Sequence, residues 1–213
     1  MTEILKSIAD IRERLKEYGD WFAKAKPTLP NAFNMIFNHT TMTLELLNYY
    51  YGIWSRTPPG VNEAEIERMR RENAERVLEV TKWAFVFALS SMEHVLKELL
   101  KADERVASAQ HLQRLRRTLL AGRRVYLSTI VKSCREAEII SDEQHEVWKC
   151  LIEVRNAVVH NNAIADRDVV YRVGDLTVTF SKGRVLRGKL DFFVRLLKAA
   201  VEHYYMLLRA LLA

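Results

Sequence analysis

The side chains of this chain that are best suited to chemistry gather in one short segment, from Arg155 to His160. A histidine titrates near neutral pH, so His160 could accept or donate a proton at a reacting hydroxyl group. The guanidinium of Arg155 could bind two phosphate oxygens and stabilise negative charge that develops on them. Asn156 could orient the histidine or a phosphate oxygen. These residue types suit acid–base chemistry beside a phosphate group.

The spacing of the three residues sets a geometric condition. On an ideal α-helix, Asn156 and His160 are one turn apart and share a face, whereas Arg155 lies about 140° around the axis from His160. Arg155 could therefore reach the same cleft only if the helix ends or bends near His160, or if a second copy of the helix faces the first. Asn161 and Asn162 suit a helix C-terminus, because asparagine tolerates the left-handed conformation.

Other signatures of enzymes are absent from the sequence. It contains no Gly-x-Gly-x-x-Gly, no phosphate-binding loop, no Gly-x-Ser-x-Gly and no His-Glu-x-x-His, and no histidine follows a glutamate by three positions. Cys134 and Cys150 lack the spacing of zinc ligands, so we expect two buried thiols and no metal. The plain alternative for the Arg155–His160 segment is an interior histidine that happens to follow a surface arginine.

The segment from Glu153 to Asn161 closely resembles the active-site signature of the HEPN family, in which Arg, often followed by a polar residue, precedes His by four to six positions. The stretch 88–100, with Glu93 in its middle, looks like the first core helix of that family. The resemblance covers about residues 75–213. One position departs from it: family branches that are paired with a nucleotidyltransferase carry Tyr two positions after the histidine, where this chain has Asn162.

The resemblance implies a small helical bundle that forms a homodimer, with two copies of the motif lining one cleft. It also implies a metal-independent endoribonuclease with catalytic Arg155, Asn156 and His160, without a cofactor, and with RNA and an antitoxin-like or regulatory protein as partners. In a toxin of those branches, modification of the Tyr silences the activity. Because this chain has Asn162 at that position, it lacks the usual target of the modification. The alternative function is a non-catalytic HEPN-like module that binds RNA, a nucleotide or a partner protein in the same cleft.

The elements that must position the motif are mainly helices. Apolar residues recur at helical spacing in the segments 3–26, 31–54, 63–101, 105–120, 123–138 and 141–160. In the first of these, Ile8, Ile11, Leu15 and Phe22 form a stripe that we expect to pack onto the bundle. The first half of 63–101 has mixed charge, which predicts a solvated face, and its apolar second half predicts the central buried helix.

Between residues 169 and 187 the period changes to two. Leu176, Val178 and Phe180 alternate with threonines, and Gly174-Asp175 and Lys182-Gly183 supply turns, which predicts a short β-hairpin of two or three strands. A last helix follows over about 190–212. We therefore predict an all-α class, a helical bundle with a short β-hairpin before its last helix. Pro58-Pro59-Gly60 divides it into an N-terminal extension, 1–57, and a HEPN-like domain, 61–213.

Two further groups of side chains suit RNA binding, each with an alternative. Five arginines in a short stretch could follow the RNA phosphates or form a solvated face, and these are Arg114, Arg116, Arg117, Arg123 and Arg124. The run Tyr49-Tyr50-Tyr51 could stack bases, but we expect these rings in the core because aromatic side chains bury large apolar areas.

The composition gives broad limits. The chain has 213 residues with 33 Lys and Arg against 27 Asp and Glu, a net charge of +6 that permits binding to a polyanion without requiring it. The N-terminal residues alternate charged and aliphatic side chains, and no apolar stretch approaches the roughly 20 residues that span a bilayer. We expect a cytoplasmic protein that does not contact a membrane.

Overall fold

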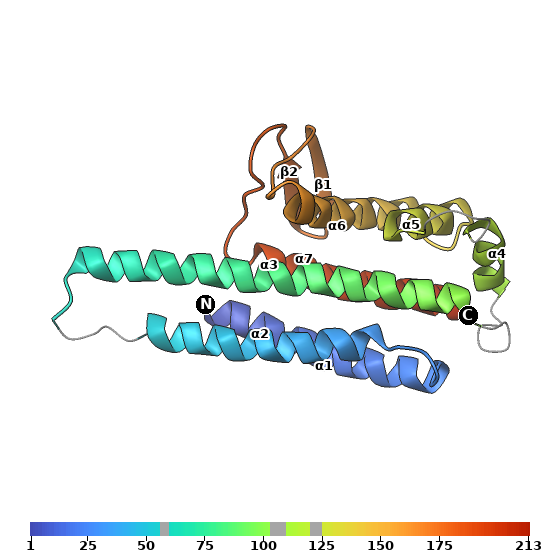
Figure 1. The fold of residues 1–213 in the computed structure, drawn as a ribbon, viewed down its shortest axis with the longest axis horizontal. Coiled ribbons are helices and arrows are strands. Elements are labelled where there is room, and N and C mark those ends of the chain that lie inside the picture. The colour runs from blue at the N-terminus through green and yellow to red at the C-terminus, as the bar shows by residue number, and fades with distance from the viewer. Residues whose placement is uncertain (56–59, 103–109, 120–124) are drawn as a thin grey trace.

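The computed structural model describes residues 1–213 except 56–59, 103–109 and 120–124. The described part is mostly helical and contains a single pair of strands, as the sequence predicts (Figure 1). In chain order the elements are α1 (Thr2–Ala25), α2 (Ala32–Trp54), α3 (Glu63–Lys101), α4 (Gln110–Leu119), α5 (Leu127–Glu136), α6 (Asp142–His160), β1 (Val169–Val173), β2 (Leu176–Phe180) and α7 (Phe192–Leu212).

The elements lie in three layers (Figure 1). α3 and α7 lie side by side in the middle, α1 and α2 cover one side of them, and α5, α6 and the hairpin cover the other, with α4 at one end. The middle layer is buried on both sides, so α3 is apolar nearly all round between Val77 and Leu100, as its sequence predicts. α6 is thereby held over α3 and α7.

α1 packs onto the bundle through the stripe that its sequence shows. Ile8, Leu15 and Phe22 are fully buried in the same core as the residues of α3 and α7. The Tyr18 ring stacks on Tyr205 of α7, with ring centroids 3.8 Å apart. The N-terminal helix therefore shares the core of the chain, whereas the division of the chain between residues 57 and 61 stays a prediction.

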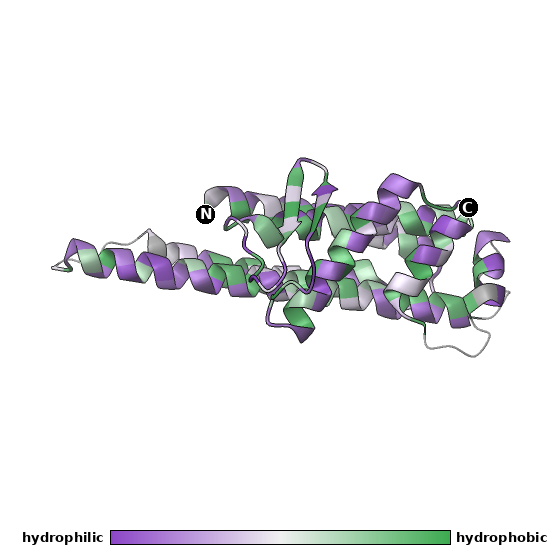
Figure 2. Cartoon of the chain, turned by 90° about the horizontal axis from the view of Figure 1, so that it is seen from above, coloured by the Kyte–Doolittle hydropathy of each residue, from purple (hydrophilic) through white to green (hydrophobic). Residues whose placement is uncertain are grey.

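The N-terminal half of α3 lies largely in solvent. Asn62 caps it by accepting a hydrogen bond from the backbone N–H of Glu65, and Arg68 lies 3.6 and 3.8 Å from the carboxylates of Glu65 and Glu72. Hydrophilic residues are prominent in this part of the helix, whereas the bundle alternates hydrophobic and hydrophilic faces (Figure 2). The predicted solvated face is therefore observed.

The expectation that the tyrosine run of α2 lies in the core is wrong for two of its three members. Tyr49 and Tyr51 are exposed, and Tyr50 is partly buried beside Arg76 of α3. Consecutive positions on a helix are 100° apart, so a helix that packs on one side can bury only part of such a run.

The hairpin covers the C-terminal part of α6. β1 and β2 are antiparallel, with Val169 opposite Phe180 and Val173 opposite Leu176. The turn between them uses Gly174 at φ +58°. Instead of a third strand, the structure has one isolated bridge between Ile164 and Val185. This bridge draws the segment after α6 toward the segment that follows β2.

Both cysteines are buried and free, as predicted. Burial raises the pKa of each thiol to about 12. Within the described residues, no helix combines the length and the apolar character that a bilayer crossing requires.

Candidate functional site

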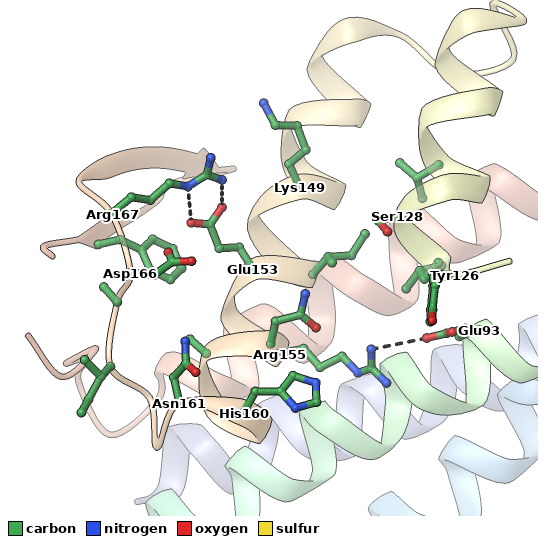
Figure 3. Close-up of a pocket in the computed structure, with 18 of the residues that line it drawn as sticks. Glu93, Tyr126, Ser128, Lys149, Glu153, Arg155, His160, Asn161, Asp166 and Arg167 are labelled. Atoms are coloured by element: carbon green, nitrogen blue, oxygen red, sulfur yellow. Dashed lines mark hydrogen bonds and ion pairs between the residues drawn. The ribbon is translucent and has the colours of Figure 1, made fainter. Parts of the chain in front are cut away.

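The three motif residues line one pocket (Figure 3). Arg155, Asn156 and His160 come from α6, and the other walls come from α3, from the N-terminal end of α5, from the segment that follows α6 and from β2. The pocket has a volume of about 750 Å³. The structure thus gathers the residues that were singled out in the sequence around one open space.

Arg155 is fixed by the central helix. Its Nη1 lies 3.4 Å from Oε2 of Glu93, and its Nη2 is 3.5 Å from Oγ of Ser90. Glu93 is only 8% exposed, and its other oxygen accepts a hydrogen bond of 2.6 Å from Lys97. One buried carboxylate therefore holds two cations. Arg155 Nε is buried and has no hydrogen-bond partner among the described residues, so part of the guanidinium's bonding capacity remains unused.

His160 is the last residue of α6, and its side chain is exposed. The helix closes there because the N–H groups of Asn161 and Ala163 both donate to the carbonyl oxygen of Ala157, at 3.0 and 2.8 Å. Asn162 and Ala163 adopt positive φ angles of 50° and 62°. The predicted left-handed ending of the helix is therefore present, and it leaves the imidazole at the mouth of the pocket.

Arg155 and His160 meet within a single protomer. The spacing left two ways to bring them together, a helix end near His160 or a second copy of the helix. The helix ends at His160, and Figure 3 shows the guanidinium and the imidazole on the same side of α6, toward α3. The first way is therefore sufficient, because the long arginine side chain spans the 140° between the two residues. A homodimer stays a prediction.

A second cluster fixes the segment that follows α6. Arg167 Nε donates to Glu153 Oε1 at 2.9 Å, a second guanidinium nitrogen pairs with the other carboxylate oxygen, and the Tyr171 hydroxyl donates to that oxygen at 2.6 Å. Burial opposes ionisation of Glu153, but these hydrogen bonds outweigh it and hold the pKa of the carboxyl below its usual value. The cluster ties α6 to β1 and closes one side of the pocket.

Further pocket residues were not singled out in the sequence. His145 and Lys149 lie on the same face of α6 as Asn156 and His160, since successive members of this set are four, seven and four residues apart, close to whole helical turns. Burial lowers the pKa of His145. The periodicity of polar residues along the helix could have identified these two. No local signal in the sequence could have identified Tyr126 and Ser128, because only the docking of α5 beside α6 brings them to the pocket.

The three described members of the arginine cluster, Arg114, Arg116 and Arg117, do not line this pocket. Arg116 donates to the carbonyl oxygens of Leu99, at 3.0 Å, and of Ala102 at the end of α3. Arg114 and Arg117 are exposed on α4, beside a separate shallow hollow. Arg123 and Arg124 lie outside the described residues. Arg116 thus caps a helix, and the cluster as a phosphate track stays a prediction for the others.

No group of three or more His, Cys, Asp or Glu side chains within the described ranges is arranged to hold a metal ion. Comparison of the chain with protein-family models, with curated proteins and with solved structures finds no match. The relation to HEPN proteins therefore remains a resemblance, carried by the Arg155–His160 motif and its setting in a helical bundle.

Proposed function

We propose that this chain is a metal-independent endoribonuclease of the HEPN type, with Arg155, Asn156 and His160 as its catalytic residues. The observation that supports the proposal best is their convergence on one pocket in which Glu93 fixes the arginine and the histidine is exposed. An exposed histidine beside a fixed guanidinium provides a proton-transfer group next to a phosphate-binding group.

The chemistry follows from these two groups. The ribose 2′-oxygen attacks the adjacent phosphorus, the bond from phosphorus to the 5′-oxygen breaks, and a 2′,3′-cyclic phosphate remains. His160 accepts the proton of the 2′-hydroxyl or donates one to the leaving 5′-oxygen. Arg155 binds the non-bridging oxygens, whose negative charge grows in the transition state.

A homodimer would add a second His160, so that one histidine could act as the base and the other as the acid. The exposed apolar side chains of Val159 and Ile164 flank His160 and favour an interface that includes α6. Static light scattering should give twice the mass of one chain at micromolar concentration. A mass of one chain would exclude the assignment of the base and acid roles to two different protomers. It would not affect the proposal for the pocket of one protomer.

The decisive experiment is incubation of the purified protein with end-labelled RNA in EDTA. We expect cleavage with 2′,3′-cyclic phosphate ends, and no cleavage of DNA or of 2′-O-methyl RNA of the same sequence, because both lack the nucleophile. RNA that stays intact in both the presence and the absence of divalent cations would refute the nuclease.

The rival function is a non-catalytic module that binds RNA, a nucleotide or a partner protein in the same pocket. One observation favours it: the Glu93 carboxylate already pairs with Arg155, and such an ion pair can serve the fold alone. Retention of RNA without cleavage would support this rival. An antitoxin-like or regulatory protein as a further partner rests on the family resemblance.

A further inference from the structure

Tyr126 is an exposed aromatic residue at an unusual position. It is the N-cap residue of α5, where Ser, Thr, Asp and Asn are preferred because their side chains accept hydrogen bonds from the first helical N–H groups. The Tyr126 side chain makes no such bond, and the residue is 51% exposed. The ring therefore contributes little to the helix start, although it forms part of the pocket wall (Figure 3).

The ring is connected to the motif by a short series of contacts. The Nζ atom of Lys97 lies 5.7 Å from the centre of the Tyr126 ring, and the same atom is 2.6 Å from Glu93 Oε1. The other oxygen of Glu93 is paired with Arg155. An ammonium group near an aromatic ring is attracted to it. The ring and the guanidinium are thus linked through Lys97 and Glu93, and Figure 3 shows both near the Glu93 carboxylate.

We propose that Tyr126 binds one unpaired nucleobase by stacking while Arg155 binds a neighbouring phosphate, so that the substrate class is single-stranded RNA. This inference rests on the proposed function for the identity of the polymer. Aromatic rings stack on bases of any sequence, because every base has a π-face. In a duplex, the bases are stacked on each other and their faces are not available to a side chain. Lys149, on the α6 wall of the same pocket, adds a positive charge toward the backbone of the strand.

The structure supplies a matched control. Trp83 of α3 is also an exposed aromatic residue on a helix, with the same 51% exposure as Tyr126, but it does not line the pocket. Replacement of Trp83 should change surface aromatic content without changing the pocket.

The test measures RNA binding in a His160→Ala background, which prevents cleavage during the titration. The probe is a short fluorescein-labelled single-stranded oligoribonucleotide of mixed sequence, followed by fluorescence anisotropy. Tyr126→Ala should raise the Kd by roughly 5- to 150-fold, the range for the loss of one stacked base. Tyr126→Phe and Trp83→Ala should bind as the background does, and the annealed duplex should bind more weakly than the single strand. Circular dichroism should show unchanged helicity in each variant.

The possible outcomes separate this inference from the nuclease itself. If Tyr126→Ala binds the single strand as tightly as Tyr126→Phe, or if no variant binds RNA, base stacking by Tyr126 is refuted. If RNA binding depends on the Tyr126 ring but the wild type never cuts RNA, base stacking by Tyr126 is supported and the nuclease function is refuted. In protein that retains His160 and cleaves RNA, Tyr126→Ala should raise KM with little change in kcat. An unchanged KM would refute base stacking by Tyr126 without affecting the nuclease proposal.

Discussion

Two arginines reach toward α3 from different helices, and their surroundings differ. Arg116 of α4 donates to backbone carbonyl oxygens at the C-terminal end of α3, which lack partners within the helix. Arg155 of α6 pairs with a carboxylate in the buried middle of α3, and it lines an open pocket with a histidine at its mouth. The first arginine completes a helix terminus, whereas the second places its charge in the wall of a pocket.

The number of basic residues in a sequence segment is therefore a weak guide to function. The segment around α4 is the richer in arginine, yet the best-defined contacts there serve the fold. α6 has a single arginine, and there a fixed cation and a titratable group line one pocket. If this comparison is right, variants on α6 should affect activity and variants at Arg116 should affect stability.

The largest effect is expected for His160→Ala. RNA cleavage should fall by at least about 10²- to 10⁴-fold, the range typical of general acid–base catalysis. The melting temperature should stay near that of the wild type, because the side chain is exposed at a helix end. Initial rates under saturating RNA, with calorimetry alongside, check both parts. Full activity in this variant would remove His160 from the site.

Arg155→Ala should be nearly as damaging to cleavage, by about 10²- to 10³-fold, because a donor to the developing charge is lost. Arg155→Lys retains the charge but not the paired donors, so it should recover only part of the rate. Arg155→Ala also leaves the Glu93 carboxylate paired with Lys97 alone, so the stability of this variant should be measured by urea unfolding. A rate for Arg155→Lys equal to that of the wild type would show that bidentate binding by Arg155 is not used.

At Arg116 the pattern should reverse. Arg116→Ala leaves carbonyl oxygens at the end of α3 without donors, and it should lower the free energy of unfolding by about 1–3 kcal/mol. Arg117→Ala, at an exposed position on the same helix, is the matched control and should leave stability within about 0.5 kcal/mol. Urea unfolding checks both. Cleavage per folded molecule should not change in Arg116→Ala. A loss of cleavage would contradict a purely structural role for Arg116.

The smallest effect concerns Glu153, whose hydrogen bonds to Arg167 and Tyr171 lower the pKa of the carboxyl against the effect of burial. A lowered pKa in the folded state stabilises the fold above the unfolded pKa of about 4.3, and this stabilisation disappears as the pH falls through the folded value. Glu153→Gln should therefore reduce stability by about 1 kcal/mol at pH 7, with a smaller difference near pH 3. A difference that is constant with pH would rule out ionisation of Glu153 as its cause.

Most of the fold could be predicted from the sequence because its signals are local. Three kinds of local signal each predict an element to within a few residues of its observed bounds. They are the apolar stripe from Ile8 to Phe22, the helix-capping residues Asn62 and Ser141, and the alternation of apolar and polar residues around Val178. Tyr49 and Tyr51 show the limit of such reasoning. Residue type favours burial of these rings, but the docking geometry of α2 decides their exposure.

The site was predictable only in part. Arg155, Asn156 and His160 were found because they are close in sequence and lie on one helix. Their surroundings come from α3 and α5, more than thirty residues away in some cases, so the pairing of Arg155 with Glu93 and the position of Tyr126 depend on tertiary packing. The role of Arg116 was missed for the same reason: its acceptors belong to another helix.

The length of α3 has a consequence for hydrodynamic behaviour. Its 39 residues extend about 58 Å, whereas a compact sphere of 213 residues would measure about 44 Å across. A rod that projects beyond the body increases frictional drag, so a single chain should elute from a gel-filtration column ahead of globular standards of its mass. Elution volume alone would then mimic a dimer, and the scattered intensity, which reports mass independently of shape, is the quantity that counts subunits.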